Sequence, residues 1–170
     1  FTLSALAALA AHGQTPEDLT GATLAEASAR IRSRSLTPTQ LVQACLSRLD
    51  TYNPKLNAFI TVLGDQALSQ ARVLEAEQKA GKFRGPLHGI PVAVKDNIHT
   101  TNMPTTGGAL AFDGFVPPYE ATLVKNLRDA GAIIIAKTGM TELANWVAGA
   151  PSPMPANYNA IAGYGMNPYD

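Results

Sequence analysis

The sequence of residues 85–98 is Gly85-Pro86-Leu87-His88-Gly89-Ile90-Pro91-Val92-Ala93-Val94-Lys95-Asp96-Asn97-Ile98. The run from Ile90 to Val94 is apolar, rich in β-branched residues and preceded by glycine and proline, which favours a buried strand over a helix. Asp96-Asn97 is a typical turn pair, because short side-chain oxygens bond the nearby backbone. The segment therefore predicts a strand that ends at Lys95 and a turn directly after it.

An amine at the end of a buried strand is costly to keep charged, since desolvation disfavours the ammonium form and lowers its pKa. A neutral lysine can act as a general base, or as a nucleophile towards carbonyl groups. Lys95 could instead extend into solvent or pair with Asp96, which would be a structural role. The residues alone leave both roles open.

A second strand is predicted downstream of the first. Residues 123–130 have a helical apolar pattern that Gly131 ends, and Ala132–Ala136 is a second apolar run. Strand, helix and strand in this order predict a parallel pair with a right-handed crossover, and so an α/β fold. Functional groups of parallel sheets gather beyond the carboxyl ends of the strands, where Lys95 and Lys137 both lie.

Helices are predicted before this unit. Thr23 and Thr37 each start a segment with capping-box spacing, which predicts one helix to about Arg34 and a second that Asn53-Pro54 closes. Residues 56–63 alternate enough to form a strand, and the helix after it extends from Asp65 to Gly81. We therefore divide the chain into an N-terminal helical section (1–55), the start of an α/β core (56–147) and a loop (148–170).

The bulk composition excludes several classes of protein. The 170 residues suffice for one domain or a large part of one. Thirteen basic and thirteen acidic side chains cancel, so neither a nucleic-acid surface nor a polybasic membrane patch is expected. No stretch approaches the length of a membrane span.

Cys45 is the only cysteine, which excludes an intrachain disulfide and a multi-cysteine metal site, and its surroundings suggest a core residue. We expect a cytoplasmic protein, with a periplasmic or secreted one as the alternative. Phe1–Ala11 is apolar and could end a secretory segment, but its leucine spacing also suits the ordinary helix that we favour.

Residues 89–98 resemble the lysine segment of the amidase signature family. The similarity continues through residues 128–138 and 141–146 and reaches Asn167-Pro168-Tyr169-Asp170. The resemblance implies an α/β/α fold with a central mixed, largely parallel sheet preceded by N-terminal helices, of which this chain carries the first part.

The resemblance also implies an amidase that hydrolyses linear carboxylic amides without a metal or organic cofactor. In this family one serine attacks the carbonyl carbon, a second serine in a cis peptide relays its proton, and a neutral lysine drives the relay. Lys95 matches that lysine, whereas Lys137 matches no catalytic position and is expected to be a structural or rim residue. By position, Glu142, Asn145 and Trp146 are candidate substrate-binding residues. Alternatively they form a short helix whose Leu143 and Trp146 pack inward.

Two departures from the family pattern affect the expected pocket. Gly107-Gly108 stands where related enzymes often show Ala-Gly-Ser, and Thr138-Gly139-Met140 replaces the commoner Thr-Asn-Met. Both put the details of the substrate pocket in doubt and leave Lys95 unaffected.

The family's two serines follow a segment like the last residues of this chain. Ser152 is the only serine after Lys95, and it lacks the glycine-rich context of a nucleophile. We therefore expect the serines to lie in the remainder of the domain, possibly on a separate chain, and the isolated 170 residues to be inactive. The expected partners are that remainder, a small-molecule or peptide amide and possibly a second copy of the chain, with no nucleic acid or membrane.

Other functions remain open at this stage. Within the family, the alternative is the amide-transferring A-type subunit of a tRNA-dependent amidotransferase. Outside it, the chain could be a catalytically inactive interaction module, or Lys95 could form a Schiff base. A metal site at His88 and His99 is not expected, because their spacing matches no ligand signature.

Overall fold

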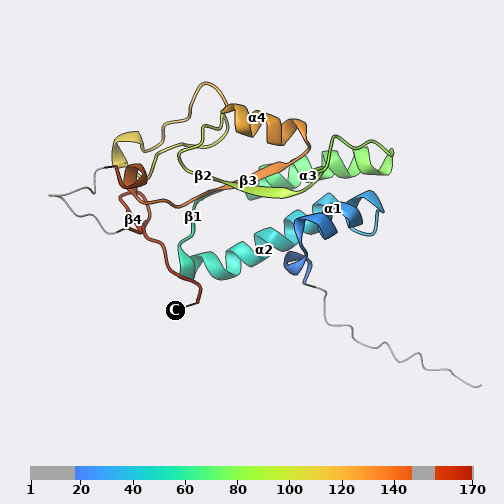
Figure 1. The fold of residues 1–170 in the computed structure, drawn as a ribbon, viewed down its shortest axis with the longest axis horizontal. Coiled ribbons are helices and arrows are strands. Elements are labelled where there is room, and N and C mark those ends of the chain that lie inside the picture. Colours follow the sequence, from blue (N-terminus) through green and yellow to red (C-terminus); the bar gives the residue numbers. More distant parts are fainter. Residues whose placement is uncertain (1–17, 147–155, 170) are drawn as a thin grey trace, which may run out of the picture.

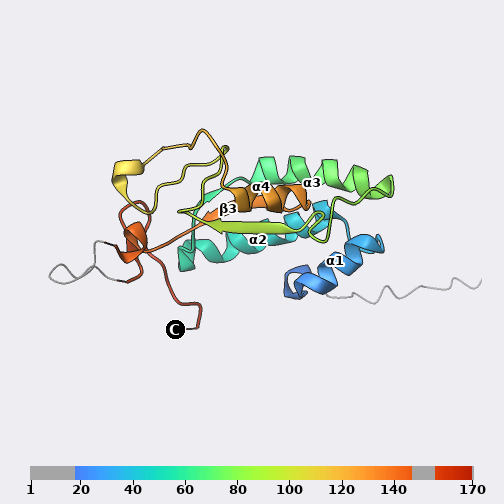
Figure 2. The same cartoon turned by 45° about the horizontal axis from the view of Figure 1, so that its top comes forward.

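The computed structural model describes residues 18–146 and 156–169 and shows a small sheet between helices on both faces (Figures 1 and 2). The strands β1 (Phe59–Val62), β2 (Pro91–Lys95) and β3 (Ile133–Thr138) lie in the order β1-β3-β2. β2 is parallel to β3, as predicted, and β1 is antiparallel to it. The predicted α/β fold with a mixed sheet is confirmed.

The N-terminal helices begin where the sequence predicts. A 3-10 turn, η1 (Leu19–Gly21), precedes α1 (Leu24–Arg32) and α2 (Pro38–Leu56). Both helices have complete capping boxes, in which the threonine before the helix and the third helical residue exchange hydrogen bonds.

The predicted end of α2 is wrong. The helix continues through Pro54 to Leu56 and ends at Asn57, whose φ of 49° is left-handed. Pro54 is accommodated within the last turn, and the helix ends where Asn57 adopts the left-handed conformation typical of helix C-termini.

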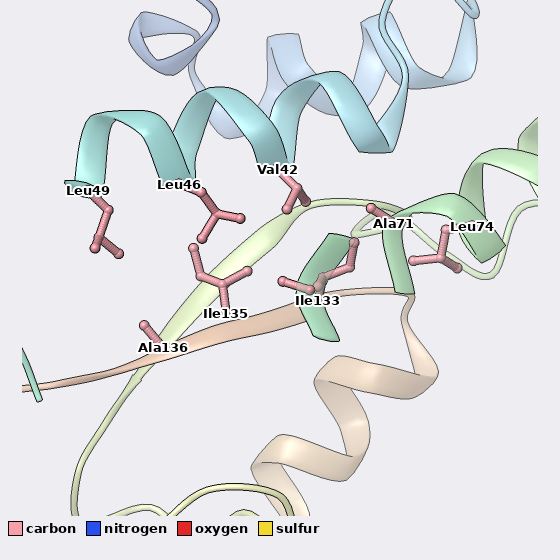
Figure 3. Packing of buried hydrophobic residues seen from close by; sticks show 9 residues of the cluster. Val42, Leu46, Leu49, Ala71, Leu74, Ile133, Ile135 and Ala136 are labelled. Atoms are coloured by element: carbon pink, nitrogen blue, oxygen red, sulfur yellow. The ribbon is translucent and has the colours of Figure 1, made fainter. Parts of the chain in front are cut away.

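Helices cover both faces of the sheet. α2 and α3 (Gly64–Lys79) pack on one face, and α4 (Thr122–Asp129), which connects β2 to β3, packs on the other. Figure 1 shows α4 and α2 on opposite sides of the strands. Leucine and valine side chains of α2 point towards isoleucines of β3 in the core between the helices and the sheet (Figure 3). Full burial of each such side chain stabilises the fold by about 1.5–3 kcal/mol. The buried members of this cluster are Val42, Leu46, Leu49, Ala67, Ala71, Leu74, Ile133, Ile135 and Ala136.

The connection from α4 to β3 passes close to the segment that precedes β2. Gly131 has a φ of 92°, and a Cβ atom at this position would lie 2.7 Å from the Cα atom of His88. Its carbonyl accepts a hydrogen bond from the amide of Gly89 at 2.8 Å. Only glycine combines this conformation with such a close approach, which brings β3 alongside β2.

The described part of the predicted C-terminal loop contains a short hairpin of β4 (Tyr158–Asn159) and β5 (Gly163–Tyr164). Nδ2 of Asn57 donates to the carbonyls of Ala162 at 2.6 Å and Tyr164 at 2.9 Å, which fastens the hairpin to the end of α2. The helix predicted for Phe1–Ala11 lies outside the described residues. Among the helices that the structure describes, none is long and apolar enough to cross a membrane.

Candidate active site

Lys95 is the last residue of β2 and lies opposite Thr138 of β3, at the carboxyl edge of the parallel pair. Its side chain is exposed. The desolvation predicted for this amine is therefore not found within the described residues. β2 is an edge strand of the described sheet, and Lys95 is the residue at which it ends.

The turn after Lys95 is firmly held. The amide of Ile98 donates to the carbonyl of Lys95 at 2.9 Å, which closes the predicted turn, and the amide of Asp96 donates to the carbonyl of Thr138 at 3.2 Å. The carboxylate of Asp96 is buried, and its Oδ2 atom accepts hydrogen bonds from the amide and the hydroxyl of Thr106. The turn itself is found where it was predicted, but the Asp96 side chain bonds Thr106, ten residues further on, and not the backbone of the turn.

The charged partner of Asp96 is Lys137 and not Lys95. Nζ of Lys137 lies 3.9 Å from Oδ1 of Asp96, and both side chains have an exposed fraction of 0%. Nζ also donates to the carbonyl of Ile98 at 2.5 Å and to Oγ1 of Thr105 at 2.7 Å. Burial lowers the pKa of Lys137 to about 8, and the nearby Asp96 carboxylate acts in the opposite direction.

Lys137 is thus a buried structural residue and not a rim residue. Both lysines were expected at strand ends, but the desolvated amine was predicted at Lys95. The sequence carried no signal that separates the two lysines, because each directly follows a short apolar run.

The predicted substrate-binding residues lie in and after a 3-10 turn, η3 (Glu142–Asn145). The amide of Leu143 donates to the carbonyl of Gly107 at 2.7 Å, and the amide of Gly107 donates to the carbonyl of Asp96 at 3.0 Å. Backbone hydrogen bonds therefore link η3 to the turn that follows Lys95. The alternative of an inward-packed Trp146 is wrong, because its exposed fraction is 85%.

The backbone of η3 is unusual. Leu143, Ala144 and Asn145 have φ values of 45°, 54° and 67°, in the left-handed region that costs a residue with a side chain about 1–2 kcal/mol. Such conformations persist where the surroundings enforce them, and they cluster at functional sites. Glu142 is half-buried and Asn145 is exposed.

His88 and His99, which flank Lys95 in the sequence, both contact other residues of the fold. Nε2 of His88 lies 2.9 Å from the carbonyl oxygen of Leu74, and Nδ1 accepts from the amide of Arg84 at 3.2 Å. His99 packs against the rings of Phe115 and Tyr119. In the part of the chain that the structure describes, no three histidine, cysteine or acidic side chains come close enough to hold a metal ion. Ser152 lies outside the described residues.

A cavity of about 680 Å³ lies between α2, the sheet and the C-terminal segment. Ala93, Ile135 and Tyr169 are among its lining residues. Because side chains alternate along a strand, Lys95 belongs to the same face of β2 as Ala93. Cys45 also lines this cavity, and burial raises the pKa of its thiol.

Comparisons with known proteins identify relatives of this chain. A family model described as Amidase matches residues 40–170. The chain is 42% identical over 127 residues to the A-type subunit of the glutamyl-tRNA(Gln) amidotransferase of Acidothermus cellulolyticus, a match that covers 75% of this chain and 25% of that protein. It is 46% identical over 124 residues to the corresponding mitochondrial protein of Mus musculus, with 73% of this chain and 23% of that protein covered.

Solved structures give the same result. The peptide amidase of Stenotrophomonas maltophilia superposes with a TM-score of 0.77 at 42% identity, and the match covers 86% of this chain and 30% of that one. An amidase family protein of Bacillus anthracis superposes with a TM-score of 0.79 at 29% identity, with 94% of this chain and 33% of that one covered. The chain therefore spans about a quarter to a third of the length of these relatives.

Proposed function

This chain belongs to the amidase family, and on that basis we propose that it forms the lysine-bearing part of an enzyme that cleaves the C–N bond of carboxylic amides. The observation that carries the proposal is the exposed amine of Lys95 on a fixed turn at the carboxyl edge of β2 and β3. A general base must be within reach of the proton that it accepts. The amine of Lys95 is accessible to such a group from outside these residues, whereas the amine of Lys137 is enclosed.

In the proposed reaction, a serine from the remainder of the protein attacks the amide carbonyl carbon and passes its proton through a second serine to neutral Lys95. The tetrahedral intermediate carries its negative charge on oxygen, where backbone N–H groups stabilise it. Collapse breaks the C–N bond, and the amine leaves with the proton that Lys95 returns. Water then attacks the acyl-serine ester and passes a proton through the second serine to Lys95, and that proton returns to the first serine as the carboxylic acid is released.

Part of the Lys95 environment must come from outside these residues. The relatives are three to four times longer than the matched segment, so residues of the remainder can cover the exposed amine. Covering the amine would desolvate it and favour its neutral form, which is the form a base requires. The described residues alone supply no such cover, and we propose that the isolated chain does not hydrolyse amides.

The proposed substrate is a small-molecule or peptide amide. The exposed indole of Trp146 and the side chains of Glu142 and Asn145 are proposed to contact it, since η3 is bonded to the turn that carries Lys95. An exposed aromatic side chain provides a large apolar contact surface with little loss of conformational entropy.

The test is hydrolysis of a C-terminally amidated peptide by the full-length protein and its Lys95→Ala variant. We expect a fall in kcat of about 10²–10⁴-fold, which is typical for loss of a general base. Lys82→Ala, at another exposed lysine, serves as the matched control and should keep the wild-type rate. A Lys95→Ala enzyme that keeps a tenth of that rate would exclude the assigned role. A fluorophosphonate label would then locate the serine nucleophile.

A second candidate is amide transfer to glutamyl-tRNA(Gln). The observation in its favour is the 42–46% identity to proteins named for that activity. The two functions differ in the acceptor of the acyl or amide group. Release of ammonia from an amidated peptide without tRNA supports the hydrolase, and formation of glutaminyl-tRNA only in the presence of glutamyl-tRNA(Gln) and an amide donor supports the transferase.

A further inference from the structure

Lys95 and Lys137 belong to opposite faces of the sheet because β3 contains a bulge. Val92 lies opposite Ile134, but the next residue of β2, Ala93, lies opposite Ala136. The extra residue in β3 is therefore Ile135. A bulge reverses the alternation of all side chains that follow it, and bulges often re-aim a side chain beside a functional site.

The packing of β3 shows this reversal. Ile135 and Ala136 are adjacent in sequence, yet both contribute to the core cluster under α2 and α3. Ile134 packs with Val94 in the cluster under α4. Lys137 consequently points to the α4 side, where it reaches the loop after β2, and not to the face of Ala93.

The amine of Lys137 connects both ends of that loop. It donates to the carbonyl of Ile98, in the turn after Lys95, and to Oγ1 of Thr105, seven residues further on. Oγ1 of Thr105 in turn donates to the carbonyl of Ile98 at 3.4 Å. The Lys137 side chain thus adds to the backbone bond between Asp96 and Thr138 in holding the turn against β3.

Asp96 completes the arrangement. One carboxylate oxygen accepts two hydrogen bonds from Thr106, and the other, Oδ1, faces Lys137 and accepts no hydrogen bond from another described residue. Burying such an ion pair commonly stabilises a fold less than apolar residues of the same volume would. A gain in stability is therefore a weak reason for Lys137 to stand here.

We propose that Lys137 is a positioning residue for Lys95, which acts by holding the turn of Lys95, Asp96 and Ile98 against β3. The inference rests on the proposed function of Lys95. A misplacement of a reacting group by about 1 Å can lower a rate by about 10²-fold, so a side chain that fixes this turn can affect the reaction without contacting substrate. Lys137 itself transfers no proton, because its amine is enclosed and occupied by the loop.

The test uses the full-length protein with two variants. Lys137→Met combined with Asp96→Asn removes the bonds from Lys137 to the loop without leaving one buried charge unpaired. Gln78→Met is the matched control, because Nε2 of Gln78 is a buried donor that holds the carbonyls of Ile31 and Leu36, far along the chain from Lys95. Each variant thus loses one buried side-chain donor to the backbone, and the double variant also changes the carboxylate that faces that donor.

Two readouts are needed. In the double variant, hydrogen exchange of the amides in residues 96–107 should accelerate at least tenfold without substrate, while the amides of α2 remain protected. In addition, kcat should fall by about 10²-fold with KM changed less than threefold. Gln78→Met should leave both quantities at wild-type values.

If Lys137 only stabilises the fold, the two readouts should differ from these expectations. Unchanged exchange in residues 96–107, or a kcat no lower than that of Gln78→Met, would overturn the proposal. Thr105 supplies a conservative check, because Thr105→Ser keeps the hydroxyl acceptor and should keep kcat, whereas Thr105→Val should lower it. If the wild-type protein hydrolyses no amide, the proposed function fails, and the exchange measurement still decides whether Lys137 holds the turn.

Discussion

Oδ1 of Asp96 lies 3.9 Å from Nζ of Lys137, and neither side chain is exposed. Asp96 directly follows the last residue of β2, and Lys137 lies in β3 opposite Val94. A buried ion pair therefore lies directly beneath the turn that presents the candidate base.

Lys137→Met alone should lower the free energy of unfolding by about 3–5 kcal/mol, because it leaves the carboxylate of Asp96 buried without its partner. Adding Asp96→Asn should recover most of that loss. Urea unfolding of the four proteins in this double-mutant cycle measures the coupling. Additive effects of the two substitutions would contradict a direct interaction between the two side chains.

The free energy of unfolding should rise with pH between about 8 and 10.5, relative to the Lys137→Met/Asp96→Asn variant. The pKa of Lys137 is lowered from 10.5 to about 8 in the folded protein, so in this window the unfolded chain binds a proton that the folded protein does not. Below pH 8 the difference between the two proteins should be constant. Urea unfolding at pH 7, 8, 9 and 10 measures it, and a difference that stays constant up to pH 10 would show that Lys137 keeps its proton in the folded protein.

Gly131→Ala should destabilise the protein by more than about 2 kcal/mol, since it adds a clash with the backbone of His88 to the cost of a left-handed conformation. Gly114→Ala is the control, because its φ of 71° is similar but no atom lies within 4 Å of the added Cβ. That variant should lose about 1 kcal/mol. Thermal unfolding compares the two, and equal losses would show that the close approach to His88 is unimportant.

Asn57→Gly should cost about 1–2 kcal/mol, because glycine adopts the left-handed conformation but loses the bonds to the carbonyls of Ala162 and Tyr164. Asn57→Ala should cost about 1 kcal/mol more, since alanine also resists that conformation. The measurement is the free energy of unfolding of both variants. If glycine and alanine cost the same, backbone conformation contributes nothing at this position.

Much of the fold could be predicted from local sequence. Thr23 and Thr37 mark helix starts because a capping box needs only residues that are three apart. The apolar runs before Lys95 and Lys137 predict strands for a similar reason, as each is short and bounded by turn residues. The end of α2 could not be placed, because Asn57 is fixed by bonds to a hairpin about a hundred residues away.

The candidate site was likewise only partly predictable from the sequence. Its position at the carboxyl edge of β2 and β3 follows from the order of strand, helix and strand, and Lys95 was identified from its motif. The exposure of Trp146 and the link from η3 through Gly107 to Asp96 could not be predicted, because they depend on contacts between segments that are distant in sequence.

Local patterns along the chain were enough to establish an α/β fold, a resemblance to amidases and a strand that ends at Lys95 before a turn. Which of the two strand-end lysines is buried, and which of them pairs with Asp96, depends on how the strands pack together. The physical reason is the bulge at Ile135, which reverses the direction of Lys137. A bulge depends on the register between two strands that pair across about forty residues of intervening chain, and no local pattern in either strand specifies that register.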